Sequence, residues 1–239
     1  MYFMKKLSTL LLSFIVAQSG FAQLTPGPTK GGIIGKLYLG VNMDSYLLSS
    51  ADMEHPLHTS PGTERVVAVP RFTMFPHLGT TAHYNFTKNF GLISGLGIKN
   101  LGFIEKINDP DSTVIRRNYT IGIPLGIKIG NMFRTYAMLG GGVDIPFWYK
   151  EKGFVKRGDK TKINEWFSQR TATVLPYVFV GARFNPGVIV KATYYPANFM
   201  NTDYKQTVNG VTVKPYADYN VNIFLLSVGV DMTYRAKHD

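Results

Sequence analysis

The chain has 239 residues, no cysteine and a formal net charge of +11 at pH 7. Hydrophobic residues make up 45% of it and charged residues only 17%, against about 25% charged residues in a typical soluble domain. An extensively disordered chain is therefore excluded. The lack of cysteine excludes a disulfide framework, a thiolate zinc site, a cysteine nucleophile and a lipid anchor attached through cysteine.

The first part of the chain, residues 1–22, has the three parts of a secretory signal peptide. Lys5 and Lys6 form a positive segment, a short apolar run follows, and Gly20-Phe21-Ala22 places small residues on both sides of a bulky one. This pattern predicts cleavage after Ala22. The apolar run is too short for a membrane-spanning helix, and no later run reaches the roughly 18 to 20 apolar residues that such a helix needs.

Residues 23–32 are rich in proline and glycine and show no periodicity, which predicts a flexible periplasmic lead-in. Residues 33–236 are expected to form one barrel domain. Within it, eight segments alternate apolar residues with polar or small ones, which is the pattern of a β-strand. These segments are 36–42, 71–86, 90–103, 119–129, 137–147, 174–184, 188–194 and 221–234.

The connections between these segments alternate in length. Three are tight, at residues 87–89, 131–133 and 185–187, and four are long, at residues 43–68, 105–117, 149–171 and 197–219. Tight turns at one end and long loops at the other predict an all-β fold, an eight-stranded antiparallel up-and-down barrel. The even number of strands places both chain termini at the end with the tight turns.

The direction of the apolar face separates two classes of barrel. A soluble, lipocalin-like barrel buries this face, whereas an outer-membrane barrel exposes it to lipid. Charged residues are nearly absent from the apolar positions, and aromatic residues lie beside the tight turns, as in an interfacial girdle. These aromatic residues are Phe86, Phe90, Tyr136, Phe184 and Tyr234. We therefore expect a transmembrane barrel in the outer membrane, and a soluble periplasmic barrel is the alternative.

Five prolines fall inside the expected strands or at their ends. Each of them removes a donor from the hydrogen-bond ladder, and a closed barrel has no free edge at which to place them. We therefore expect bulges or strand ends at these positions, which are Pro76, Pro124, Pro146, Pro176 and Pro196.

Six basic residues occupy the polar face of the expected strands and would point into the lumen. They are Lys36, Arg71, Lys99, Lys128, Arg183 and Lys191. Asp144 and Asp231 are the clearest acids on the same face. Because an eight-stranded barrel is just wide enough to be filled by side chains, we expect a hydrogen-bonded plug. Binding or conduction of an anion or small solute by the excess positive charge is the alternative.

Residues 150–170 are strongly basic and include aromatic residues, and we expect a long extracellular loop there. Its candidate contact residues are Lys150, Lys152, Phe154, Lys156, Arg157, Lys160 and Trp166. Such a loop is suited to the phosphates of lipopolysaccharide or to a protein partner. A solvated loop without a ligand is an equally open interpretation.

No catalytic, metal or cofactor site is predicted. His55 and His58 lie three residues apart, but Pro56 prevents a helix that would bring them together, so a surface loop is expected there. His77 and His83 lie on the lumen face, and the chain contains no His-x-Ser pair or Gly-x-Ser-x-Gly elbow. An enzyme is therefore not expected, and neither is nucleic-acid binding, because the compartment is wrong and no recognition motif occurs.

Two neighbouring segments, Asn118–Gly130 and Tyr136–Gly142, have the sequences NYTIGIPLGIKIG and YAMLGGG. They resemble the small outer-membrane barrels of Bacteroidota that are loosely called PorT-like. The resemblance extends by pattern over most of the chain after the signal peptide. It implies an outer-membrane barrel of a Gram-negative-type bacterium, and a role as an accessory of an envelope or secretion complex, since the family includes a component of the type IX secretion and gliding machinery.

The last strand contains Ser227, Gly229, Met232 and Tyr234 in the spacing Ser-x-Gly-x-x-Met-x-Tyr. This spacing resembles the signature that the outer-membrane barrel assembly machinery recognises on a final strand. The sequence departs from the usual form because five residues follow the last aromatic residue. Substitution of Tyr234 by Ala or of Gly229 by Asp is therefore expected to reduce insertion without affecting export across the inner membrane.

Overall fold

The computed structural model describes residues 34–35, 37–56, 62–72, 77–108, 111–155 and 160–234. The predicted signal peptide and lead-in, together with Lys36, His58, Pro76, Lys156 and Arg157, lie outside these residues. The strands are β1 (Leu37–Pro56), β2 (Thr63–Val67), β3 (His77–Asn85), β4 (Phe90–Asn108), β5 (Asp111–Gly130), β6 (Tyr136–Val155), β7 (Lys160–Trp166), β8 (Leu175–Phe184), β9 (Val188–Tyr195), β10 (Gln206–Val208), β11 (Val211–Val213) and β12 (Asn220–Tyr234).

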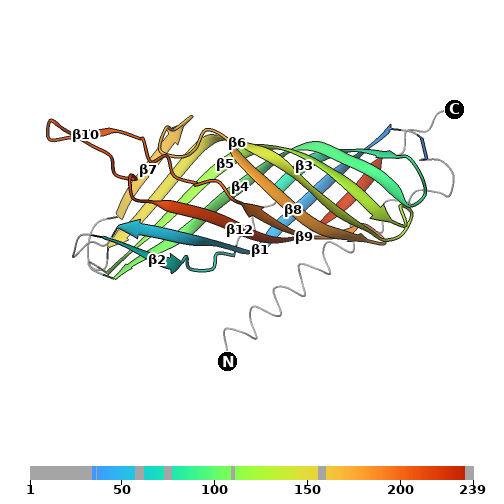
Figure 1. Cartoon of the computed structure of the whole chain (residues 1–239), viewed down its shortest axis with the longest axis horizontal. Coiled ribbons are helices and arrows are strands. Elements are labelled where there is room, and N and C mark those ends of the chain that lie inside the picture. Colours follow the sequence, from blue (N-terminus) through green and yellow to red (C-terminus); the bar gives the residue numbers. More distant parts are fainter. Residues whose placement is uncertain are drawn as a thin grey trace, which may run out of the picture.

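Eight of these strands form a closed antiparallel ring, in the order β1, β3, β4, β5, β6, β8, β9 and β12, with β12 pairing back to β1. The predicted eight-stranded up-and-down barrel is therefore confirmed. The closing pair runs from Leu39 opposite Tyr234 to Glu54 opposite Asn220. Figure 1 shows strands that are strongly tilted along an elongated barrel, as closure of a ring requires. The described residues contain no helix that is long and apolar enough to cross a membrane.

The strands extend much further than the sequence predicted at the end away from the tight turns. β4 and β5 remain paired from Phe90 opposite Ile129 to Asn108 opposite Asp111, and β6 continues to Val155, where it pairs with β7. The predicted loops at 43–68, 105–117 and 149–171 are therefore largely wrong. Polar residues occupy both faces of these extensions, so the apolar alternation that predicts a strand stops where the extensions begin.

The position between β1 and β4 in the barrel wall is occupied by two shorter strands. β3 pairs with the first part of β1 and β2 with its last part. Between them, isolated bridges join Ser49 to Arg71 and Val69 to Ile104. Of the strand predicted at 71–86, β3 covers His77–Asn85 and Arg71 forms only the isolated bridge, while residues 73–76 lie outside the described part of the chain.

The prolines lie where the ladder is interrupted. Pro146 lies at a bulge, where β5 pairs Thr120 with Pro146 but Tyr119 with Trp148, which leaves Phe147 without an opposite residue. Pro176 is the second residue of β8, and Pro196 follows the end of β9. Pro124 lies within β5, and there the pairing with β4 is broken between Leu125 and Gly122.

The two faces of the ring differ in the way that the alternation predicted. Large apolar side chains project from the outer surface, for example Leu39 at 58%, Leu125 at 63% and Leu139 at 56% exposed. Lys128 and Asp144 face inward from the same strands β5 and β6 and are fully buried. The outer apolar residues form a belt from the tight turns to the level of Ile121, which we call the apolar band.

The far end of the lumen contains an apolar cluster. The segment after β9 folds back into the barrel, so that Phe199 is completely buried and packs edge-on against Phe103 of β4, with the ring centroids 5.5 Å apart. A bridge between Thr171 and Met200 joins this segment to the one before β8. Beyond it, the separate β10–β11 hairpin projects from that end of the molecule (Figure 1).

Candidate functional site

The interior of the barrel is a stack of polar clusters, which we describe from the tight turns upward. In the first cluster, Asp231 of β12 is buried between Arg183 of β8 and His83 of β3. The Arg183 Nε atom lies 3.6 Å and the His83 Nε2 atom 3.5 Å from its Oδ2 atom. The Thr81 hydroxyl donates to the other carboxylate oxygen at 3.3 Å. This carboxylate therefore compensates the charge of Arg183 inside the barrel.

Lys128 of β5 belongs to the same cluster but is held by neutral groups. Its ammonium donates to Asn85 Oδ1 at 2.6 Å and to Tyr38 Oη at 3.2 Å, and it lies 3.3 Å from His83 Nδ1. The ring centroid of Tyr136 is 5.3 Å away. Because its side chain is completely buried, these contacts replace the water that would otherwise solvate the charge.

The second cluster lies halfway up the lumen and is built on two carboxylates. Asp44 of β1 binds Lys191 Nζ at 3.0 Å and lies 3.3 Å from His77 Nδ1. Asp144 of β6 binds Lys99 Nζ at 2.8 Å and accepts a hydrogen bond from Tyr195 at 2.6 Å. Each lysine of this level therefore has its own carboxylate.

A cavity of about 70 Å³ lies beside this second cluster. Asp44, Lys99 and Lys191 line it together with Tyr177 and Phe179. Most of its remaining lining side chains are apolar, among them Ile93, Met138 and Ile189, and Thr81 of the first cluster also lines it. The arrangement is therefore that of a filled lumen with an internal pocket.

The third cluster closes the far end and is centred on Glu105 of β4. This carboxylate is completely buried; it accepts a hydrogen bond from Arg116 Nη1 of β5 and one from Tyr219 Oη at 3.0 Å. Arg116 also donates to Glu151 Oε2 at 3.0 Å. His55 Nδ1 lies 3.5 Å from Glu105, so the expected surface loop at His55 is wrong: β1 continues to Pro56 and buries this ring.

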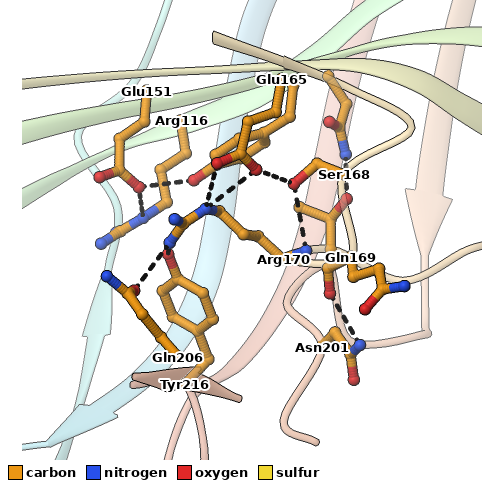
Figure 2. A network of polar contacts seen from close by, with 12 residues as sticks. Arg116, Glu151, Glu165, Ser168, Gln169, Arg170, Asn201, Gln206 and Tyr216 are labelled. Carbon is orange, nitrogen blue, oxygen red and sulfur yellow. Dashed lines mark hydrogen bonds and ion pairs between the residues drawn. The ribbon is translucent and has the colours of Figure 1, made fainter. Parts of the chain in front are cut away.

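A further network lies next to the third cluster and is shown in Figure 2. Arg170 donates through Nε to both oxygens of Glu165, at 3.2 and 3.1 Å, and through Nη1 to Tyr216 Oη at 3.2 Å and Gln206 Oε1 at 3.3 Å. Burial opposes the charge of Arg170, but Tyr216 and Glu165 raise the pKa of its guanidinium above the usual value. Burial, reinforced by Glu151, raises the pKa of the Tyr216 hydroxyl. The network ties the β10–β11 hairpin to the mouth of the barrel.

The structure places four of the six predicted lumenal cations in the first two clusters, and these are Lys99, Lys128, Arg183 and Lys191. Arg71 is buried but donates to Asn100 Oδ1 at 3.1 Å. Asn100 occupies the face of β4 opposite to that of Lys99, so Arg71 is not part of these clusters. Lys36 lies outside the described residues.

The candidate contact residues of segment 150–170 lie on strands rather than in a loop. Lys150, Lys152 and Phe154 belong to β6, and Lys160 and Trp166 to β7. β6 and β7 form a hairpin in which Phe154 lies opposite Lys160 and Trp148 opposite Trp166. Of the expected loop at 150–170, only residues 167–170 lie outside the strands among the described residues, and residues 156–159 lie outside the described part of the chain.

The residues of the expected assembly signal lie at the seam that closes the ring. Ser227 is buried and donates to Asp44 Oδ2 at 3.3 Å, and Gly229 lies opposite Asp44. Met232 lies opposite Val41 and is half-buried, and the backbone of Tyr234 pairs with Leu39. These positions have a structural role at the seam in addition to any recognition in assembly.

Sequence reasoning missed Asp44, Glu105, Arg116 and Glu151, because all four fall in segments that were expected to be loops. The alternation of inward positions did indicate two of them, Asp44 and Glu105. Asp44 continues the inward series of Tyr38, Gly40 and Asn42, and Glu105 continues the series of Lys99. Among the described residues, no group of three or more His, Asp or Glu side chains is arranged to hold a metal ion.

No family model and no curated protein matches the chain. The chain is similar in fold to solved outer-membrane proteins. The solid-state NMR structure of AlkL in lipid bilayers has 15% identity, covers 90% of this chain and 98% of its own, and gives a TM-score of 0.47. Neisserial surface protein A has 13% identity, coverages of 83% and 99% and a TM-score of 0.37. Ail of Yersinia pestis, solved with the heparin analogue sucrose octasulfate, has 15% identity, coverages of 80% and 98% and a TM-score of 0.29.

Proposed function

We propose that the protein is a non-enzymatic, integral barrel of the outer membrane, exported by its predicted signal peptide and inserted by the barrel assembly machinery. The observation that supports this most is that apolar side chains lie on the outside of the barrel and charged side chains inside it, the reverse of a soluble barrel. The closed ring exposes a continuous apolar band, while its interior holds paired carboxylates and cations. Such a surface is stable against lipid and unfavourable against water.

A substitution pair tests the membrane location. Leu125 of β5 in the apolar band and Val211 of β11 are each 63% exposed. Leu125→Arg is expected to lower the free energy of unfolding in lipid vesicles by about 2–4 kcal/mol, because it places a cation in the hydrocarbon region. Val211→Arg is expected to leave it unchanged. Equal tolerance of both substitutions, measured by urea titration and by carbonate extraction of membranes, would assign the protein to the soluble class.

We further propose that the protein acts as an accessory of a larger envelope or secretion complex, in line with its PorT-like segments. The filled lumen favours this role over that of a solute conduit, because ion pairs occupy the path at three levels. Contact with protein partners is assigned to the β10–β11 hairpin. Val208, Val211 and Val213 are exposed on it, and it pairs with no other strand among the described residues. An exposed two-stranded edge can accept a strand from another protein.

The hairpin can be tested without disturbing the barrel. Replacing Val208 and Val211 by Lys is expected to reduce crosslinking between a photoreactive residue at position 213 and its envelope partners at least severalfold, because the substitutions remove the apolar side of the edge. The matched control replaces Thr207 and Thr212 by Lys on the other side of the same hairpin. Equal crosslinking of both variants would show that the hairpin is not the partner surface.

A further inference from the structure

The outer face of the strand extensions begins with an aromatic ladder. Tyr119 of β5, Trp148 of β6 and Trp166 of β7 lie opposite one another in the register. The rings of Tyr119 and Trp148 stack at 5.0 Å between centroids, and those of Trp148 and Trp166 at 4.6 Å with an angle of 3° between their planes. Ile121 and Ile145 of the apolar band lie directly below and are 43% and 41% exposed. The ladder therefore marks the upper edge of the band, where membrane proteins place aromatic rings.

Above this ladder, the outward positions of β4 to β7 carry six cations and no acid among the described side chains. We call this set the cationic wall. Its members are Lys106, Arg117, Lys150, Lys152, Lys160 and Lys162. The register aligns them across the strands. Arg117 lies opposite Lys150 and Lys152 opposite Lys162, and Lys106 and Lys160 lie in one row, joined through Thr113 and Phe154.

The acids of the same strands whose side chains the structure describes point the other way. Glu105, Glu151 and Glu165 occupy the alternate positions and pair with Arg116 or Arg170 on the inner side. None of the ion pairs between described residues includes a member of the cationic wall. Among the residues that the structure describes, sorting of charge by strand face therefore leaves six cations facing outward without a carboxylate partner.

One of these cations, Lys150, is held close to the ladder, and Arg117 lies opposite it in the register. Lys150 Nζ lies 3.5 Å from the ring centroid of Trp148 and 5.2 Å from that of Tyr119. Burial, together with the charges of Arg117 and Lys152, lowers the pKa of Lys150. The Nε atom of Arg117 is buried and has no hydrogen-bond partner. The cations at this level are therefore close enough to disfavour one another's charge, and a bound anion would relieve this repulsion.

We propose that the cationic wall and the aromatic ladder bind the phosphate groups of lipid headgroups in the leaflet that surrounds this end of the barrel. The wall starts two residues above the aromatic ladder that marks the upper edge of the apolar band, a rise of about 7 Å along a strand, which is the level of the headgroups. The cationic wall is on the outside of the barrel, so the headgroup of a lipid beside the barrel can contact it while the lipid stays in the bilayer. A cluster of unpaired Lys and Arg near a membrane surface attracts anionic lipid. This inference rests on the membrane location proposed above.

The two tryptophans provide a selective probe, because the chain contains only Trp148 and Trp166. The full-length protein is placed in phosphatidylcholine nanodiscs that contain either diphosphoryl lipid A or the same lipid without its phosphates. We expect the phosphorylated lipid alone to shift the tryptophan emission and to remain bound in native mass spectrometry. Lys152→Gln combined with Lys162→Gln is expected to weaken this binding roughly tenfold, from the loss of two charges at the membrane surface.

The matched control is Lys205→Gln combined with Lys214→Gln, which removes the same charge from exposed positions near the β10–β11 hairpin. It is expected to bind as the unaltered protein does. Equal binding of the phosphate-free lipid, an unchanged Lys152/Lys162 variant, or displacement of the lipid by millimolar inorganic phosphate would each overturn the proposal. Extraction of the protein by carbonate would instead overturn the membrane location, so the two failures are distinguishable.

Discussion

Replacement of Glu105 by Gln is expected to lower the free energy of unfolding by about 3–5 kcal/mol, the range for breaking a buried ion pair on one side. Glu105 is completely buried, and its carboxylate binds Arg116, Tyr219 and His55 from three different strands or segments. Without its negative charge, Arg116 retains only Glu151 as a carboxylate partner. The measurement is urea-dependent unfolding of the protein in lipid vesicles, followed by heat-modifiable migration in gels.

The control for this substitution is Asp203→Asn. Asp203 also forms an ion pair, with Lys214 Nζ at 2.8 Å, but its side chain is 84% exposed. Solvent screens such a pair, so no measurable change is expected. If Glu105→Gln were as mild as the control, the far end of the lumen would have to be hydrated, and the third cluster would not act as a plug.

Replacement of Gly229 by Asp is expected to abolish most insertion, and replacement by Ala is expected to lower stability by about 1–3 kcal/mol, the usual cost of overpacking. A Cβ atom at this position would lie 2.3 Å from the carbonyl oxygen of Met43 and 2.4 Å from Cβ of Asp44. The backbone of β1 cannot move away without opening the seam between β1 and β12. The aspartate would also place a second carboxylate beside Asp44.

The control is Gly97→Ala in β4, where the nearest atom to an added Cβ is 3.3 Å away. Its insertion and thermal stability are expected to be close to those of the unaltered protein. Comparison with Tyr234→Ala then separates the two roles of the last strand. A loss of insertion with Tyr234→Ala, in protein that is stable once refolded in detergent, supports recognition by the assembly machinery. Normal insertion of both Gly229 variants would contradict the steric argument.

The part of the fold inside the apolar band was predictable because the band imposes a strict alternation of side chains. Ile121, Ile123 and Leu125 alternate with Gly122 and Pro124. In a closed sheet such a pattern places all the large apolar side chains on one face. Above the band, the outer face is no longer apolar, so the alternation of apolar and polar residues weakens. Lys150 faces outward and Glu151 inward, and a polar residue followed by another polar residue gives no periodic signal.

The same limit explains the errors about charge. The sequence indicated an excess of cations in the lumen, since Asp44 fell in an expected loop and was not counted. The pair of His55 with Glu105 joins residues 50 positions apart in two segments that were both expected to be loops. Long-range pairs of this kind follow from register, and register depends on strand lengths that a purely polar segment does not reveal.

The strands differ in length around the barrel, so its two sides are unlike. β5 and β6 each have 20 residues, whereas β8 has 10 and β9 has 8. A neighbour that approaches β5 and β6 therefore meets a tall, positively charged flank, while one that approaches β8 and β9 meets a surface that ends near the apolar band. Rotation of the barrel about its own axis therefore changes which of these two surfaces a neighbouring molecule meets. A neighbouring protein with an acidic side would be oriented toward β5 and β6, whereas close apolar packing would occur against β8 and β9.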